Sequence, residues 1–276
     1  PLWLKIQKEE IQMRNLKRTL SLVMAMALIV GMMVVSASAV SYNDLTDKDQ
    51  IVNKDAVSML VSLGIIEGKP DGSYAPTENV DRAQMAKMLS VIMNKGVDNS
   101  ALYQSVNSGL TDITSNWAKG HINYCYTTGI IAGRGNGTFD PSATVTALEA
   151  AKMLLVAVGY DPKIEGFEGA DWAINVSVRA DEQGIFEGFT KDLSAPLNRD
   201  DAALLIYNAL DVEMIESYTT NNYPIVYSDH RTILSDKYGV IKVEGVVTAN
   251  EWAILDDDTD TALQEGKTRI YNPDGI

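Results

Sequence analysis

The chain has 276 residues, 46% of them hydrophobic, which is enough to bury the core of one or two domains. Its formal net charge of −14 argues against nucleic-acid binding and against association with anionic lipid, because both need a basic face. Cys125 is the only cysteine, so an intramolecular disulfide is excluded and the fold must depend on its core.

The N-terminal part of the chain has the features of an export signal. Residues 13–39 contain basic residues, an apolar run and then Ala37-Ser38-Ala39, which predicts a secretory signal peptide cleaved after Ala39. A membrane anchor is the alternative, but the apolar run is short for a bilayer and no basic stop-transfer cluster follows it. We therefore expect no membrane attachment after cleavage. Residues 1–12 lack a starting methionine and are interpreted as a non-native leader.

Three segments of the chain share one frame, which predicts an internal repeat. Each contains a glycine followed by isoleucine, and a proline at the same distance after that glycine. Apolar residues at helical spacing before the glycine predict a helix that the glycine ends. A single hairpin cannot bury its own apolar stripe, so the three are expected to pack together. The glycines are Gly64, Gly129 and Gly184, and the prolines are Pro76, Pro141 and Pro196.

A second helix is predicted after each proline, because a capping signature stands there. A short polar residue caps the first turn, and an acid or amide three residues later can return a hydrogen bond. The pairs are Asp81 with Gln84, Thr146 with Glu149, and Asn198 with Asp201. Because Asp201 is shorter than glutamate, the return bond is not expected in the third copy.

The C-terminal part changes to β-branched and alternating residues. This predicts strands over 225–227 and 240–248, and a β-rich segment over 214–276. Because residues 272–276 end on a turn signal, we expect the segment to be truncated. Residues 256–260 place aspartates at alternate positions, but they lack the glycine and distal glutamate of a calcium loop. A solvated turn is therefore preferred over a metal site.

The repeated residues resemble the S-layer homology family. Its pattern has an aromatic-x-Asp start, a tryptophan, a Gly-Ile pair, a turn, an aromatic-x-Pro and a Thr-Arg-Ala-Glu-like helix start. The resemblance covers roughly residues 41–213. It implies a mainly α fold, with three helix-loop-helix repeats in a pseudo-threefold bundle followed by the start of the β-rich segment. The repeats are assigned to residues 40–98, 99–165 and 166–213.

The resemblance also implies a function. Members of the family bind secondary cell-wall polysaccharide, often through a pyruvate-ketal sugar, in grooves between neighbouring repeats. The chain is therefore expected to be a secreted, non-catalytic protein of the cell wall or S-layer, without a cofactor or metal, and self-assembly into a surface layer is possible. The residues that the family pattern places in polysaccharide binding are Asp44, Gly68, Arg82, Asp112, Trp117, Gly133, Trp172, Gly188 and Arg199.

No copy of the pattern is complete. Val52 stands at the tryptophan position of the first copy, and Ala147 at the arginine position of the second. In the third copy, Phe167-Glu168-Gly169 lacks the aspartate. A complete groove can still be assembled from two incomplete copies, and the repeat without an arginine is expected to be structural.

Each candidate residue also has a structural interpretation. Arg82 and Arg199 at helix starts either bind an anion or clamp neighbouring repeats. The tryptophans either stack on a sugar or pack in the core, the aspartates either accept sugar hydroxyls or cap a helix, and the glycines either offer N–H groups or only shape loops. We expect the two arginines to be decisive for binding, and alanine at either position to leave folding intact.

An enzyme has little support in the sequence. His121 and His230 lie in no metal-ligand spacing, and neither a nucleophile motif nor a phosphate-binding loop is present. The alternative function is that of an anchoring module of a larger exocellular glycanase or adhesin whose active domain lies beyond residue 276. The alternative ligand is peptidoglycan itself.

Overall fold

The computed structural model describes residues 41–242, 245–250, 252, 263 and 266–271. The predicted leader at 1–12, the predicted signal peptide at 13–39 and the aspartates at 256–260 lie outside these residues.

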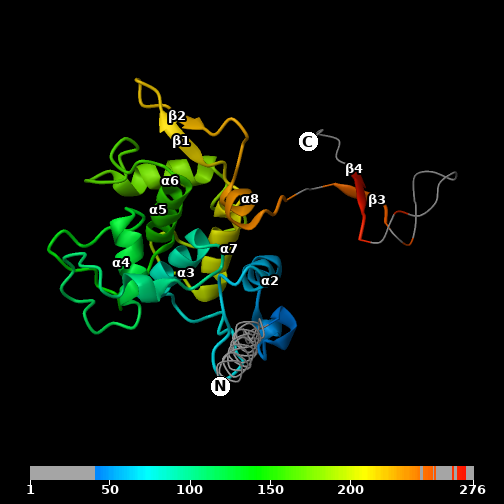
Figure 1. Ribbon diagram of the computed structural model, residues 1–276, viewed down its shortest axis with the longest axis horizontal. Helices are drawn as coiled ribbons and strands as arrows, with labels where there is room; N and C mark the ends of the chain where they lie inside the picture. The colour runs from blue at the N-terminus through cyan, green and yellow to red at the C-terminus, as the bar shows by residue number, and fades with distance from the viewer. Residues whose placement is uncertain (1–40, 243–244, 251, 253–262, 264–265, 272–276) are drawn as a thin grey trace, which may run out of the picture. The chain divides into compact units, whose positions relative to one another are not determined.

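The described chain is mostly helical (Figure 1). Helices stand before each of the three glycines and after each loop, where the sequence predicts them. The α-helices are α2 (Lys54–Ser62), α3 (Arg82–Met93), α4 (Lys119–Thr127), α5 (Ala147–Val158), α6 (Trp172–Glu182), α7 (Arg199–Ala209) and α8 (Ile233–Tyr238). Short 3-10 helices are η1 (Tyr42–Asp44), η2 (Lys48–Gln50) and η3 (Ser100–Tyr103).

Local sequence signals set the ends of these helices. Gly64, Gly129 and Gly184 have φ of 70°, 80° and 69°, the left-handed conformation that lets the chain leave α2, α4 and α6. At the starts of α3 and α5, the predicted capping boxes are present with both hydrogen bonds. At the start of α7, Asn198 accepts the N–H of Asp201 but no return bond is formed, as expected from the shorter acid.

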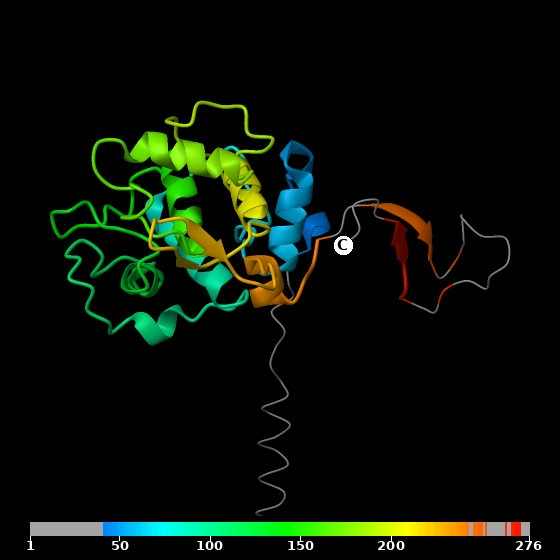
Figure 2. The same ribbon diagram turned by 90° about the horizontal axis from the view of Figure 1, so that it is seen from above.

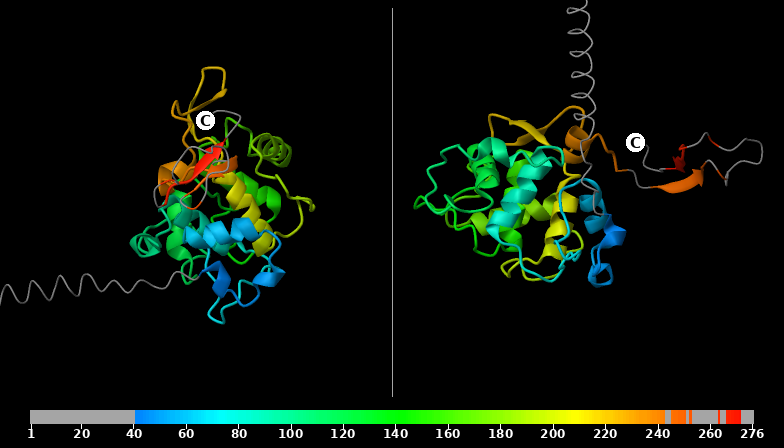
Figure 3. Two further views of the ribbon diagram at one scale, coloured as in Figure 1. Left: turned by 90° about the vertical axis from the view of Figure 1, so that its right-hand side faces the viewer. Right: turned by 60° about the horizontal axis from the view of Figure 1, so that its bottom comes forward.

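Six of the helices form three hairpins, α2 with α3, α4 with α5 and α6 with α7, and these pack in a closed cycle. The first helix of each hairpin lies against the second helix of the hairpin before it, so α4 packs on α3 and α6 packs on α5. The cycle closes because α2, the first of these helices, packs on α7, the last of the six (Figures 2 and 3). Helix α5 also contacts both α3 and α7. Burial of each helix therefore depends on a different hairpin from its own.

Three extended segments meet in a ring of backbone hydrogen bonds just before α3, α5 and α7. The N–H of Val80 donates to the carbonyl of Leu197 at 2.8 Å, and the N–H of Leu197 donates to Val145 at 2.8 Å. The N–H of Val145 then donates to Val80 at 2.9 Å, which closes the ring. All three residues are buried, so each amide finds its partner in another hairpin rather than in water.

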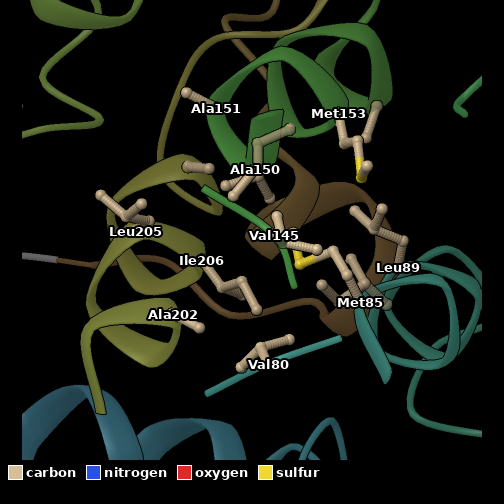
Figure 4. Close-up of a cluster of buried hydrophobic side chains, with 14 of the residues drawn as sticks. Val80, Met85, Leu89, Val145, Ala150, Ala151, Met153, Ala202, Leu205 and Ile206 are labelled. Carbon is tan, nitrogen blue, oxygen red and sulfur yellow. The ribbon is translucent and has the colours of Figure 1, made fainter. Parts of the chain in front are cut away.

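The hydrophobic core surrounds this ring. Figure 4 shows side chains from α3, α5 and α7 pointing toward one another beside Val80 and Val145. Each of the three helices contributes buried apolar residues, including Met85 and Leu89, Ala150 and Met153, and Leu205 and Ile206.

The ring corrects one detail of the predicted repeat. The N–H of Ala83 donates to Pro141 and that of Asp200 donates to Pro76, but the corresponding donor in α5, Leu148, reaches Leu193. Leu193 therefore takes the place that the prolines have in the first two hairpins. The alignment of the third copy on Pro196 was wrong, because its loop is shorter than the other two.

Among the residues after Val212 that the structure describes, there are two small antiparallel strand pairs and one helix. Strand β1 (Ile215–Tyr218) pairs with β2 (Pro224–Val226), and β3 (Val246–Ala249) pairs with β4 (Arg269–Tyr271). Strands are thus present over parts of 225–227 and 240–248, although residues 240–242 form none. The sequence interpretation did not include α8, whose Tyr238 hydroxyl donates to the carbonyl of Ile92 at 3.2 Å.

Replacing Leu205 by alanine should lower the free energy of unfolding by about 2–5 kcal/mol, because Leu205 is fully buried where α7 meets the core. Leu102→Ala is the matched control, since Leu102 is 75% exposed, and it should change stability by less than about 0.5 kcal/mol. Urea unfolding followed by circular dichroism measures both. Equal effects of the two changes would contradict the assignment of the core.

Candidate functional site

Arg82, in the first turn of α3, joins two hairpins. Its Nε donates to the carbonyl of Phe139 at 2.8 Å and its Nη2 to that of Ala132 at 2.9 Å. The guanidinium also lies 4.3 Å from the centre of the Phe139 ring. Only 4% of Arg82 is exposed, and this burial lowers its pKa to about 10. The guanidinium is still charged at neutral pH, because this pKa lies well above 7.

Arg199, in the first turn of α7, makes the corresponding contacts with the loop of the first hairpin. Its Nε donates to the carbonyl of Tyr74 at 2.8 Å and its Nη2 to that of Glu67 at 3.2 Å. Its guanidinium lies 4.8 Å from the centre of the Tyr74 ring. Both arginines therefore clamp a loop of another hairpin, which is the structural alternative stated above, and both also border a groove.

Groove A is a hollow of about 250 Å³ to which three hairpins contribute. The first hairpin supplies the loop of Gly68 and the side of α3, the second supplies Trp117, and the third supplies Arg199. Trp117 is 58% exposed, so its ring is available to a ligand rather than part of the core. Groove A thus brings together three of the nine predicted residues.

Groove B is the counterpart of groove A, one hairpin further along, with a volume of about 590 Å³. Here the second hairpin supplies the loop of Gly133 and the side of α5, the third supplies Trp172, and the first supplies Arg82. Trp172 is half-buried, and the Nζ of Lys152 lies 5.7 Å from the centre of its ring. Three more of the predicted residues therefore meet in one place.

The remaining predicted residues lie outside both sets of lining residues. Asp112 accepts the backbone N–H groups of Phe139 and Asp140 at 2.9 Å and 2.7 Å, and so shapes its own loop. Asp44 accepts the N–H of Ser41 at 3.0 Å, as a cap of η1. Gly188 lies beside α7, where a Cβ added to it would be 3.7 Å from Leu204.

Asp47, which the sequence interpretation missed, is the structural counterpart of Asp112. Its carboxylate accepts the N–H groups of Tyr74 and Ala75 at 2.7 Å and 2.8 Å. Ala75 and Asp140, at corresponding positions, have φ of 56° and 62°, so the two aspartates hold strained left-handed backbone. A signal was available, because Leu45-Thr46-Asp47 repeats as Leu110-Thr111-Asp112.

Neither metal-binding nor membrane-spanning features were found in the part of the chain that the structure describes. It contains no group of three His, Cys, Asp or Glu residues able to hold a metal ion. None of its helices combines the length and the apolar character needed to cross a bilayer. Cys125 is buried, and this burial raises the pKa of its thiol.

Comparison with known proteins bears on the family of the first two hairpins. The model of the S-layer homology domain matches residues 41–86 and 109–151, which include the first-turn residues of α3 and α5. The chain contains S-layer homology domains. The resemblance found in the sequence is thereby confirmed for the first two hairpins, each of which supplies the glycine loop of one groove.

Several relatives of this chain are named as cell surface or S-layer proteins, and one is named as an exoglucanase. A cell surface protein of Thermoanaerobacter kivui is 28% identical over 95% of this chain and 32% of its own length. An S-layer protein of Bacillus licheniformis is 30% identical (54% of this chain, 16% of its own), and the exoglucanase XynX of Acetivibrio thermocellus is 27% identical (63% and 16%). The chain spans about a third or less of each. Family and relatives indicate a location at the cell wall or cell surface.

Replacing Arg82 by alanine should lower the free energy of unfolding by about 2–4 kcal/mol, because two carbonyls then lose a charged donor in a buried place. The structure thus opposes the expectation that folding is unaffected. Arg134→Ala is the control, since Arg134 forms only partly exposed ion pairs, and about 0.5 kcal/mol or less is expected. An unchanged urea midpoint for the Arg82 variant would show that the clamp does not stabilise the fold.

Acid should weaken the fold through His121, whose Nδ1 lies 2.6 Å from Ser90 Oγ and whose Nε2 lies 3.6 Å from Asp98. Burial lowers the pKa of His121 below 6.5, so its contribution is complete above pH 6.5 and is lost as the pH falls through the folded-state pKa. Urea midpoints at about pH 7, 6 and 5 should decline less steeply in His121→Gln than in the parent. Parallel declines would exclude His121 as the cause.

Proposed function

We propose that the chain fastens a secreted protein non-covalently to the bacterial cell wall. The ligand is a secondary cell-wall polysaccharide, pyruvylated as is frequent in the family, and it binds in grooves A and B. One observation carries the proposal: each groove receives a glycine loop, a tryptophan and an arginine from three different hairpins. The first copy of the sequence pattern lacks the tryptophan and the second lacks the arginine, yet the closed packing assembles the full set twice.

The charge of the grooves supports an acidic ligand. The chain as a whole has a net charge of −14, so an anionic polymer is repelled at long range and must be held by short-range contacts. Both grooves concentrate cations. Lys69, Lys87 and Arg199 line groove A against one carboxylate, Glu67. Arg82, Arg134 and Lys152 line groove B against two, Glu149 and Glu168.

The three hairpins are proposed to be three repeats of one unit related by a pseudo-threefold axis. The ring of Val80, Val145 and Leu197 supports this, because each residue donates one hydrogen bond to one of the other two hairpins and accepts one from the other. The third hairpin lies outside the two regions that match the family model. Its shorter loop and Leu193 in place of proline account for a weaker sequence signal.

A second candidate function is that of the anchoring module of a larger exocellular glycanase or adhesin. The exoglucanase relative favours this, because the region that it shares with this chain is a small part of its length. Sequencing the gene beyond codon 276 distinguishes the two. A carbohydrate-active domain would favour the enzyme, and further β-rich segments would favour a layer-forming protein, for which self-assembly is then expected.

Binding of the chain to purified wall sacculi should depend on the polysaccharide and should be strengthened by the tryptophan of each groove. Trp117→Ala and Trp172→Ala should each weaken binding roughly twofold to tenfold, through loss of a stacking surface. Trp252→Ala is the matched control, since Trp252 is 83% exposed and lines neither groove, and it should bind like the parent.

The measurement is a sedimentation assay with sacculi before and after extraction of the polysaccharide. Loss of binding on extraction supports the proposal. Binding that survives extraction would point to peptidoglycan and overturn the choice of ligand. Binding by the double tryptophan variant at the parent's strength would overturn the choice of grooves.

A further inference from the structure

The second helices of the three hairpins differ at one position that borders the grooves. Counting from the hydrogen-bonded ring, Lys87 in α3 and Lys152 in α5 occupy the same position. Lys87 lines groove A and Lys152 lines groove B. The corresponding residue of α7 is Leu204, which has no charge.

The lysines are better placed than the arginines to receive a ligand. Arg82 and Arg199 each direct Nε and Nη2 to carbonyls of a neighbouring loop, so two of the three guanidinium nitrogens already serve the fold. Lys87 Nζ is paired with the largely exposed carboxylate of Glu67 at 3.1 Å. A ligand carboxylate can replace that partner without breaking a contact between hairpins.

Lys152 is held over the aromatic surface of groove B. Its Nζ faces the ring of Trp172 at 5.7 Å, so an acidic sugar stacked on that ring would meet the ammonium group. Burial lowers the pKa of Lys152, which is the response of a cation that lacks a full solvent shell. Pairing with a carboxylate would compensate for this loss of solvent.

The corresponding face between the third and first hairpins lacks these groups at the matching positions, and the cation of its loop, Lys191, is already paired with Asp201 at 2.5 Å. Leu204 lies beside Gly188, and Phe189 follows that glycine where the grooves have Lys69 and Arg134. The arginine position is Ala147 and the tryptophan position is Val52. This face also holds the buried carboxylate of Asp200, which accepts the N–H groups of Val52 and Asn53 and would repel a second anion.

We propose that Lys87 and Lys152 determine specificity for a sugar residue that bears a carboxylate, one in groove A and one in groove B, and that the face of Leu204 binds none. The chain then has two glycan sites rather than three. This inference rests on the proposed function and deepens it. Two sites on one rigid body also allow one chain to hold the polymer at two points, which strengthens attachment beyond the affinity of either site.

The test is titration calorimetry of the full chain with short acidic oligosaccharides released from the wall polysaccharide of the producing bacterium. The same oligosaccharides with their carboxylates reduced to alcohols are the second probe. Two sites per chain are expected for the parent. Lys87→Met and Lys152→Met should each remove one site or weaken it about tenfold to a hundredfold, and carboxyl reduction should weaken both sites similarly.

Lys163→Met is the matched control, because it makes the same change of charge at an exposed position that lines neither groove. Circular dichroism checks the fold of each variant, and Lys→Gln replaces any methionine variant that is unstable. Parent-like affinity in both lysine variants, equal affinity for the reduced probe, or three sites per chain would overturn the inference while leaving the proposed function in place. If the parent binds neither probe, both the inference and the proposed function are overturned.

Discussion

The backbone ring of Val80, Val145 and Leu197 is the constraint on which the rest of the molecule depends. Each of these buried amides has its partner in another hairpin, and an unpaired amide at this depth would cost free energy on the order of 1–3 kcal/mol. The ring therefore fixes the three entries into α3, α5 and α7 relative to one another. Because Arg82 and Arg199 come two residues after the ring, their direction toward the neighbouring loops is fixed as well.

The same constraint explains why grooves form between incomplete repeats. A loop, a tryptophan and an arginine that are far apart in the sequence meet because each hairpin contacts both of the others. The first copy lacks a tryptophan and the second lacks an arginine, but these two losses fall on the same face. The missing tryptophan and the missing arginine therefore affect one face only, and the two grooves keep the full set of residues.

Much of this arrangement was predictable from the sequence. The helices, the glycine ends, the two capping boxes and the missing return bond at Asn198 follow from local chemistry, which sequence spacing reports directly. The position of Pro196 was misleading, because a shortened loop happened to place a proline at the expected distance from Gly184. Only the hydrogen bonds of the ring reveal the correct register.

The site was predictable in its residue types and less so in their roles. Three predicted residues meet in each groove, but the aromatic-x-Asp start points to Asp44, whereas Asp47 is the aspartate that holds the loop. Arg82 both clamps a loop and borders a groove, because it is buried beside the carbonyls of residues 132 and 139. No local sequence pattern indicates this burial or these two partners. The lysines stand out only once the three helices are superposed in register.

The packing of α2 on α7 has a consequence for how the chain reaches its folded state. Every helix of the cycle buries its apolar face against another hairpin, and the last partner needed is α7, which ends at Ala209. A chain that is synthesised from its N-terminus cannot complete the cycle until α7 has been made. The contact between α2 and α7 joins the first and the last helix of the cycle. Until then α2 lacks the helix against which it packs, so the last hairpin decides when the body closes.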